Sequence, residues 1–178
     1  MRTLVIGGSG SGKSEFAERE ITKLHPAAAS DKYYIATLMP FGREDEARIA
    51  RHREQRATRG FTTVEQYTAL AELQLPTRGG ALLECLGNLA ANELFAPEGA
   101  GTEHAEAAML RGVIALESQC DDLIVVTNDV FADGETYEPE TENYIAVLAA
   151  VNRKLAQRFD RVVEVVCGIP IALKGEIA

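Results

Sequence analysis

Short apolar runs alternate with longer segments of helical period along most of the chain. A run of four to seven mostly apolar or β-branched residues is typical of a buried strand, whereas apolar residues three and four apart are typical of a helix with one buried face. These patterns predict strands over 3–6, 32–36, 62–65, 81–84, 123–127 and 161–166, and helices over 13–24, 45–59, 86–95, 103–120 and 140–159. Such alternation is typical of an α/β fold with a mostly parallel sheet covered by helices on both faces.

Length and composition limit the number of domains that the chain can form. With 178 residues, 46% of them apolar, it is long enough to bury one substantial core. Ordinary domain sizes therefore predict a single domain over residues 1–178.

Charge and cysteine content narrow the class of protein. A formal net charge of -9 argues against a broad nucleic-acid surface, because affinity for phosphate backbones comes from clustered Lys and Arg. The cysteines are Cys85, Cys120 and Cys167, and their spacing fits no zinc site, so we interpret them as free thiols in the core. The chain starts directly with a strand pattern and has no stretch of membrane-spanning length, which predicts a cytoplasmic protein.

The first predicted strand is followed by Gly7-Gly-Ser-Gly-Ser-Gly-Lys13-Ser14 and then by a predicted helix. Strand, G-x-x-x-x-G-K-[ST] and helix together define a phosphate-binding P-loop. Its glycines let main-chain amides face phosphate oxygens, Lys13 reaches the β- and γ-phosphates, and the Ser14 hydroxyl ligates Mg2+. The sequence therefore predicts a P-loop NTPase that binds a nucleoside triphosphate with magnesium.

The fourth predicted strand, 81–84, ends in Glu84, and P-loop proteins usually carry at such a strand end an acid that orients the magnesium ion. One carboxylate after an apolar run is a weak signal, so an acid that simply ends a strand remains the alternative. The chain lacks the Asn-Lys-x-Asp sequence that recognises guanine in switch GTPases. This disfavours a signalling GTPase but leaves guanine binding by other contacts open.

Six arginines lie between Arg43 and Arg59, out of 18 Lys and Arg in the whole chain. On a helix, Arg48, His52 and Arg56 share one face. Positive neighbours keep an imidazole neutral and nucleophilic, and the arginines could hold phosphates. The alternative is a solvated helix whose arginines pair with nearby acids. The other histidines, His25 and His104, are interpreted as structural or solvent-facing.

Several of these motifs occur together in one family. They are the P-loop, Tyr34-Ile-Ala-Thr37, Ala47-Arg-Ile-x-x-His52-Arg, Leu82-Leu-Glu-Cys85 with Asn92, Val126-Thr-Asn128 and Val151-Asn152. In order and spacing the chain resembles, over nearly its whole length, the bifunctional adenosylcobinamide kinase and adenosylcobinamide-phosphate guanylyltransferase of cobalamin assembly. The resemblance implies a RecA-like P-loop domain that assembles as a trimer.

The resemblance also implies two reactions and a site. ATP or GTP would phosphorylate the aminopropanol hydroxyl of the corrinoid adenosylcobinamide, and GTP would then donate GMP through a covalent intermediate on His52. The implied nucleotide-binding residues are Gly7, Gly8, Ser9, Gly10, Ser11, Gly12, Lys13, Ser14, Ile35, Ala36, Thr37, Arg53, Glu54, Gln55, Arg56, Glu65 and Glu84, with Ser14 and Glu84 as metal ligands.

One segment departs from the family pattern. Many members have a glycine-rich stretch and then an arginine-containing segment after the fifth strand, where this chain has an acidic sequence over 130–139 and then Asn143-Tyr-Ile-Ala-Val147. The change fits a subfamily solution, a different substrate loop, or the loss of one activity. Two other functions therefore remain open: a P-loop small-molecule kinase without guanylyl transfer, and a non-catalytic nucleotide-binding module.

Overall fold

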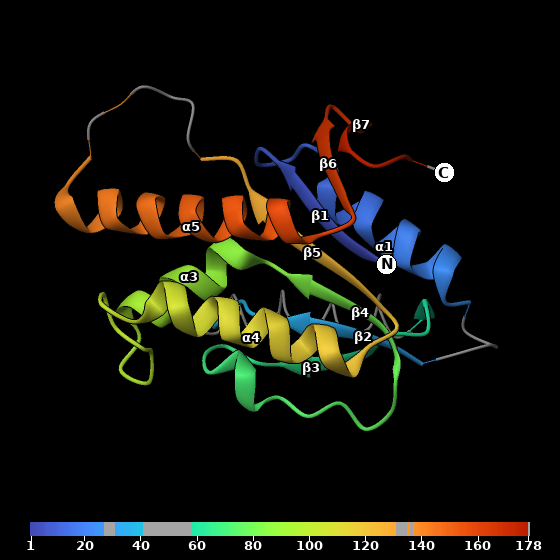
Figure 1. The fold of residues 1–178 in the computed structure, drawn as a ribbon, viewed down its shortest axis with the longest axis horizontal. Helices are drawn as coiled ribbons and strands as arrows, with labels where there is room; N and C mark the ends of the chain where they lie inside the picture. Colours follow the sequence, from blue (N-terminus) through green and yellow to red (C-terminus); the bar gives the residue numbers. More distant parts are fainter. Residues whose placement is uncertain (27–30, 41–57, 131–134, 136, 178) are drawn as a thin grey trace.

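The computed structural model describes residues 1–26, 31–40, 58–130, 135 and 137–177. Their strands form one seven-stranded sheet in the order β3-β2-β4-β5-β1-β6-β7 (Figure 1). The strands are β1 (Arg2–Gly7), β2 (Asp31–Ala36), β3 (Thr62–Glu65), β4 (Gly79–Glu84), β5 (Asp122–Asn128), β6 (Arg161–Val166) and β7 (Ile169–Lys174). The first six strands are parallel, and β7 runs antiparallel to β6.

Helices cover both faces of this sheet, as the sequence predicts. The helices are α1 (Lys13–Leu24), α3 (Leu86–Phe95), α4 (Ala105–Gln119), α5 (Pro139–Arg158) and the short 3-10 helix η1 (Leu70–Glu72). Figure 1 shows α1 on one face and α3, α4 and α5 on the other. Each face has its own apolar core: Phe16 and Ile21 of α1 pack on the first, and Leu89 and Met109 pack on the second.

The buried strands explain why the sequence patterns are continuous apolar runs. In β4, Leu82 contributes to the core beneath α1, whereas its neighbour Leu83 contributes to the core beneath α3 and α4. Successive side chains of a strand point to opposite faces, so a central strand covered on both faces needs apolar residues at every position.

Strand order places β1 at a topological switch point. The chain leaves β1 through α1, passes to β2 on one side, and later forms β6 on the other side of β1. In open α/β sheets, ligands bind at the carboxyl end of the strands where the order reverses in this way. The loop after β1 lies at that point.

The strand β7 is missing from the sequence prediction. Its outer residues Ile169, Ile171 and Leu173 are exposed, so the segment has no buried apolar run of the kind the other strands show. A turn through Cys167 (φ +50°) and Gly168 (φ +80°) forms the hairpin that pairs it with β6.

For the other predicted strands and helices, the predicted limits agree with the observed ones within two residues. Most of the helix predicted over 45–59 lies outside the described residues.

Candidate functional site

The P-loop joins β1 to α1 and has a backbone that only glycine adopts readily. Gly10 and Gly12 have φ values of +69° and +90°. A Cβ on Gly7 would lie 2.5 Å from the Oγ of Ser11 and 2.7 Å from the main-chain oxygen of Val165. No side chain caps the start of α1 at Gly12. The free amides and partial positive charge of a helix N-terminus are suited to an anion.

The turn between β6 and β7 supports the P-loop from outside. The main-chain amide of Gly168 donates to the oxygen of Ser11 at 2.8 Å. A Cβ on Gly12 would approach the Cα of Gly168 to 3.2 Å, closer than most atom pairs tolerate. The hairpin that the sequence prediction omits is therefore part of the structure that holds the phosphate loop.

Lys13, the lysine of the P-loop, is buried and lies over the loop. Its Nζ donates to the main-chain oxygen of Gly8 at 3.0 Å. This single neutral acceptor is a weak partner for an ammonium group, and phosphate oxygens provide a stronger, charge-assisted one. The side chain is thus held at the loop in a position from which it can transfer to a bound phosphate.

Ser14 and Glu84 meet although they are 70 residues apart in sequence. The Ser14 hydroxyl donates to Oε1 of Glu84, and the Tyr34 hydroxyl donates to Oε2 at 2.8 Å. A hydroxyl and a carboxylate oxygen are the hard oxygen ligands that Mg2+ prefers beside the oxygens of a nucleotide. These two side chains fit a magnesium ion, and the hydrogen bond from Tyr34 orients the carboxylate of Glu84.

Thr37 connects the ends of β2 and β4. Its hydroxyl donates to the main-chain oxygen of Cys85 at 2.9 Å and accepts from the Cys85 amide at 2.8 Å, across the cis peptide bond of Glu84 and Cys85. The side-chain amide of Asn92 donates to the oxygen of Thr37 at 2.8 Å and to that of Tyr67 at 2.9 Å. With its hydroxyl engaged in this way, Thr37 positions the loop beside Glu84.

The other strand-end residues that the sequence singles out lie at the same edge. The register pairs Ala36 with Glu65 on one side and with Glu84 on the other, so their side chains share the α1 face. Glu65 is exposed and accepts a hydrogen bond from the Tyr67 hydroxyl at 3.0 Å. Ile35 is fully buried in the core beneath the other helices, so only its main chain could reach a nucleotide.

The second group of predicted site residues lies outside the described part of the chain. His52, Arg53, Glu54, Gln55 and Arg56 all fall within residues 41–57. Their predicted positions on one helix and beside the nucleotide stay predictions.

Beyond Glu84, the site edge continues into a polar group that sequence reasoning did not assign to the site. A Cβ on Gly87 would lie 2.9 Å from Nδ2 of Asn128 and 3.0 Å from the hydroxyl of Tyr144. Burial, and secondarily electrostatic repulsion from Cys85, raise the pKa of Tyr144, so this phenol stays protonated and can donate a hydrogen bond. The sequence signals that could have indicated this group are Gly87, the second residue of α3, and Asn128, the last residue of β5.

The cysteines differ from the prediction in one respect. Cys85 and Cys120 are free and buried, and burial raises the pKa of both thiols, that of Cys120 to about 11. Cys167 is free but exposed in the β6–β7 turn, so the prediction of a core position is wrong there. Cys167 has a left-handed backbone conformation in a turn beyond the end of the sheet, and such connecting turns lie at the surface. Among the described helices, none has the length and apolar content needed to cross a bilayer.

Solved structures similar to this one share its fold. The flagellar accessory protein FlaH from Methanocaldococcus jannaschii matches with a TM-score of 0.51 and 11% identity, over 98% of this chain and 78% of that one. A KaiC-like protein from Pyrococcus horikoshii matches with a TM-score of 0.50 and 15% identity, over 92% and 69%. The fold is thus that of the RecA-like P-loop ATPases.

Sequence comparison is more specific. The bifunctional adenosylcobalamin biosynthesis protein CobP of Pseudomonas aeruginosa is 29% identical over 178 residues, covering 99% of each chain. The corresponding protein CobU of Escherichia coli is 32% identical, covering 98% of this chain and 100% of the relative. The profile of the family described as cobinamide kinase / cobinamide phosphate guanyltransferase matches residues 3–173. The chain therefore belongs to this family of bifunctional enzymes of adenosylcobalamin biosynthesis.

Proposed function

We propose that this protein phosphorylates the aminopropanol hydroxyl of adenosylcobinamide and then transfers GMP from GTP to the product, giving adenosylcobinamide-GDP. The observation that carries the proposal is the contact of Ser14 with Glu84 at the switch point of the sheet, beside a P-loop over which Lys13 lies, in a chain that belongs to this family. Both reactions need a triphosphate held at such a point.

In the kinase step, P-loop amides and Lys13 hold the phosphates of ATP or GTP. Ser14 and Glu84 would hold Mg2+, which would supply positive charge to offset the negative charge of the phosphates. The corrinoid hydroxyl oxygen attacks the γ-phosphorus and releases its proton to solvent, the bond from that phosphorus to the β-phosphate oxygen breaks, and the nucleoside diphosphate leaves. Positioning by these side chains is the main catalytic contribution in phosphoryl transfer of this kind.

In the guanylyl step, a neutral His52 attacks the α-phosphorus of GTP and pyrophosphate leaves. The phosphate oxygen of adenosylcobinamide phosphate then attacks the same phosphorus, the phosphorus–nitrogen bond breaks, and His52 is regenerated. We assign Arg53, Glu54, Gln55 and Arg56 to nucleotide contacts beside His52. Ala36, Thr37 and Glu65, with the main chain of Ile35, complete the nucleotide site.

We also propose that the chain acts as a single cytoplasmic domain within a homotrimer. An exposed apolar edge supports self-association: Ile169, Ile171 and Leu173 project from one face of β7, and β7 ends the sheet. Light scattering coupled to size exclusion tests this. A trimer that Leu173→Glu dissociates supports the assignment, and a monomeric wild type overturns it.

Incubation with α-labelled GTP and Mg2+ tests the guanylyl step. The proposal expects an acid-labile, alkali-stable label on the protein that His52→Ala abolishes and that mass spectrometry places on His52. A label that survives His52→Ala contradicts the assigned nucleophile. Transfer of γ-phosphate to the corrinoid without any covalent GMP identifies a kinase alone, and absence of any corrinoid-dependent consumption of GTP or ATP identifies a nucleotide-binding module.

A further inference from the structure

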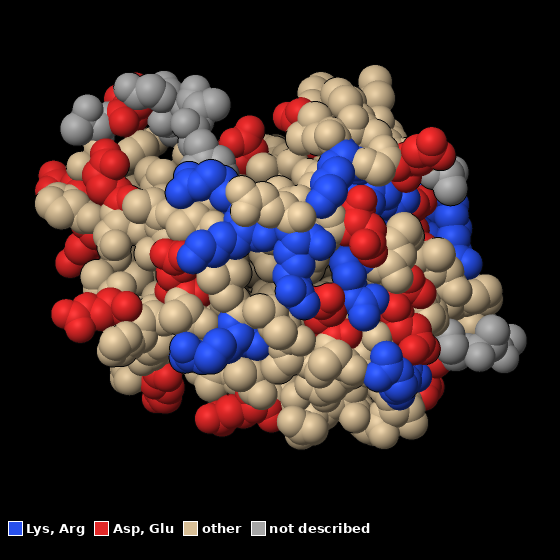
Figure 2. All heavy atoms as spheres, in the orientation of Figure 1, with Lys and Arg blue, Asp and Glu red and all other residues tan. Residues whose placement is uncertain are grey.

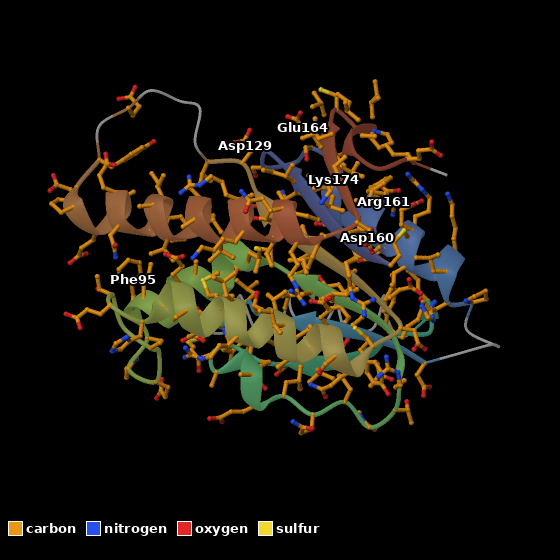
Figure 3. All side chains as sticks on the ribbon, in the orientation of Figure 1. Phe95, Asp129, Asp160, Arg161, Glu164 and Lys174 are labelled. Atoms are coloured by element: carbon orange, nitrogen blue, oxygen red, sulfur yellow. The ribbon has the colours of Figure 1, made fainter. Side chains whose placement is uncertain are left out.

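A hollow opens between α3 and α5 at the carboxyl end of the sheet. Its volume is about 320 Å³, and its lining residues are Ala91 and Phe95 of α3 with Glu140, Thr141 and Tyr144 of α5. Phe95, the last residue of α3, is 53% exposed, and Figure 3 shows it at the end of α3 near the start of α5. We call these five residues the α3–α5 hollow. An exposed aromatic ring beside an open hollow offers a flat apolar surface to a ligand.

Tyr144 connects this hollow with residues beside the phosphate site. Tyr144, which lines it, places its hydroxyl beside Gly87 together with the side-chain amide of Asn128. Gly87 lies three residues after Glu84, and the eight residues from Gly87 to Phe95 span about 12 Å of helix. A ligand seated against Phe95 can thus extend a side arm along α3 to the end of β4, where Ser14 meets Glu84.

Charge around the hollow selects against a second nucleotide. Glu138, Glu140 and Glu142 are exposed at the start of α5. Figure 2 shows Asp and Glu side chains but few Lys or Arg side chains at this end of the molecule, whereas the centre and the opposite end carry both kinds. Carboxylates at this spacing repel phosphates and attract cations or amide donors. The occupant that fits is a large planar group that is cationic and carries amides.

An alkylcobalt(III) corrinoid has that chemistry. The trivalent metal is offset by one negative charge of the corrin ring and one of the alkyl ligand, so the complex keeps a single positive charge. Its periphery carries amide donors and acceptors. The ring is larger than the hollow, so only one edge can enter while the rest lies across the opening.

Resting on the function proposed above, we propose that the α3–α5 hollow is the acceptor subsite, where Phe95 packs against one edge of the corrin and the acidic rim attracts its positive charge. The aminopropanol arm then lies along α3, with Asn128 and the hydroxyl of Tyr144 available to hydrogen-bond it near the γ-phosphate. Phe95 and Glu140 bind the corrinoid and contribute nothing to nucleotide binding.

Equilibrium dialysis against adenosylcobinamide, read by corrin absorbance, tests this subsite. The chain contains no Trp, so intrinsic fluorescence is a poor reporter. Phe95→Ser and Glu140→Lys are each expected to raise the corrinoid Kd about tenfold, as expected for loss of one aromatic contact or reversal of one charge. Both variants should keep a Kd for GTP within twofold of the wild-type value. The conservative variant Phe95→Tyr, which keeps an aromatic ring, should bind the corrinoid as the wild type does.

Glu103→Lys is the matched control, because Glu103 is an exposed acid beside the start of another helix, α4, outside the hollow. Its corrinoid Kd should equal that of the wild type. If Phe95→Ser and Glu140→Lys bind the corrinoid as the wild type does, the subsite is overturned while the proposed function stands. If the wild type itself binds no corrinoid, both fail. A Phe95→Ser variant that changes the oligomeric state but not the corrinoid Kd would assign the hollow to contact between copies, against the proposal.

Discussion

The two ends of the parallel sheet use polar residues in opposite ways. At the carboxyl end, Lys13 has one neutral acceptor, and Ser14 and Glu84 contact each other beside an open loop. At the amino end, most polar side chains are tied to one another or to main chain, and the Nη2 of Arg161 is an exception that is buried without a hydrogen-bond partner. The Nη1 of Arg161 lies 3.1 Å from Oε2 of Glu20, and both side chains are less than 10% exposed.

Other polar groups at the amino end of the sheet are also paired with protein atoms. The Nε2 of His25 lies 2.8 Å from Oδ2 of Asp122, and the amino group of Met1 lies 2.6 Å from Oδ1 of the same carboxylate. At the end of α5, Lys174 donates to the main-chain oxygens of Ala156 and Gln157, at 3.1 and 3.0 Å. Figure 3 shows Arg161 and Lys174 at this side of the molecule.

This difference separates stability from activity. Polar groups that satisfy each other lower the free energy of the fold, whereas groups with unused capacity are available to a ligand. Substitutions at the carboxyl end should therefore change kinetics with little effect on unfolding, and substitutions at the amino end should do the reverse.

The largest effect is expected for Lys13→Ala. Loss of the ammonium group removes a charge-assisted contact to the transferring phosphate, and kcat for corrinoid phosphorylation should fall about 10²–10³-fold. The free energy of unfolding should change by less than about 1 kcal/mol, because the side chain gives up only one hydrogen bond. Lys23→Ala, on the same helix with its side chain 59% exposed, is the control. A kcat within threefold of the wild type would contradict the assigned role.

Glu20→Ala should have the largest effect on stability. It leaves the buried guanidinium of Arg161 without its carboxylate, which costs about 3 kcal/mol of unfolding free energy. The GTP Kd should not change. Glu18→Ala on the same helix breaks an ion pair with Arg59 whose arginine side chain is 56% exposed, and should cost about 0–1 kcal/mol. Denaturant unfolding measures both, and equal losses would show that burial of the pair is unimportant.

Tyr34→Phe should have a smaller, kinetic effect. The hydroxyl orients Glu84, and loss of this one hydrogen bond of about 1 kcal/mol should lower kcat/KM about fivefold and raise the Mg2+ concentration needed. Tyr33→Phe is the matched control, since the Tyr33 hydroxyl lies 2.6 Å from Oγ1 of Thr77 at the amino end. That variant should lose stability and keep its Mg2+ dependence. A changed Mg2+ dependence in Tyr33→Phe together with an unchanged one in Tyr34→Phe would contradict the proposed difference between the two ends of the sheet.

The smallest effect is a pH dependence at Asp122. Burial raises the pKa of this carboxyl, but hydrogen bonds and charge from the amino group of Met1 and from His25 outweigh burial and hold the pKa below its ordinary value. The carboxylate therefore stabilises the fold above about pH 4, the value of an unfolded Asp, and this contribution is lost as pH falls through the lower folded pKa.

Asp122→Asn should accordingly lower the free energy of unfolding by about 1 kcal/mol at pH 7 and by progressively less below pH 4. Asp121→Asn is the control, because Asp121 pairs with Arg78 through side chains that are both more than half exposed. Urea unfolding from pH 7 to pH 3 measures the difference. A gap between wild type and Asp122→Asn that widens on acidification would contradict the sign of the pKa shift.

Much of the fold could be predicted because buried strands and amphipathic helices leave periodic signals. The limits of α1, α3, β3 and β6 agree with the prediction at both ends. The strand β7 could not be predicted, because an edge strand with an exposed face has no continuous apolar run. A local motif such as Gly7 to Ser14 can be recognised in the sequence, whereas a contact between residues distant in sequence, such as that of Tyr34 with Glu84, cannot.

The sequence by itself determined the α/β class, the phosphate loop and the family, because each depends on local periodicity or on a motif with fixed spacing. Only the tertiary structure decided that Tyr34 orients Glu84, that Thr37 joins the ends of β2 and β4, and that the β6–β7 turn supports the loop. Strand order controls these contacts. It is set by how the helices cover both faces of the sheet, which no single segment encodes.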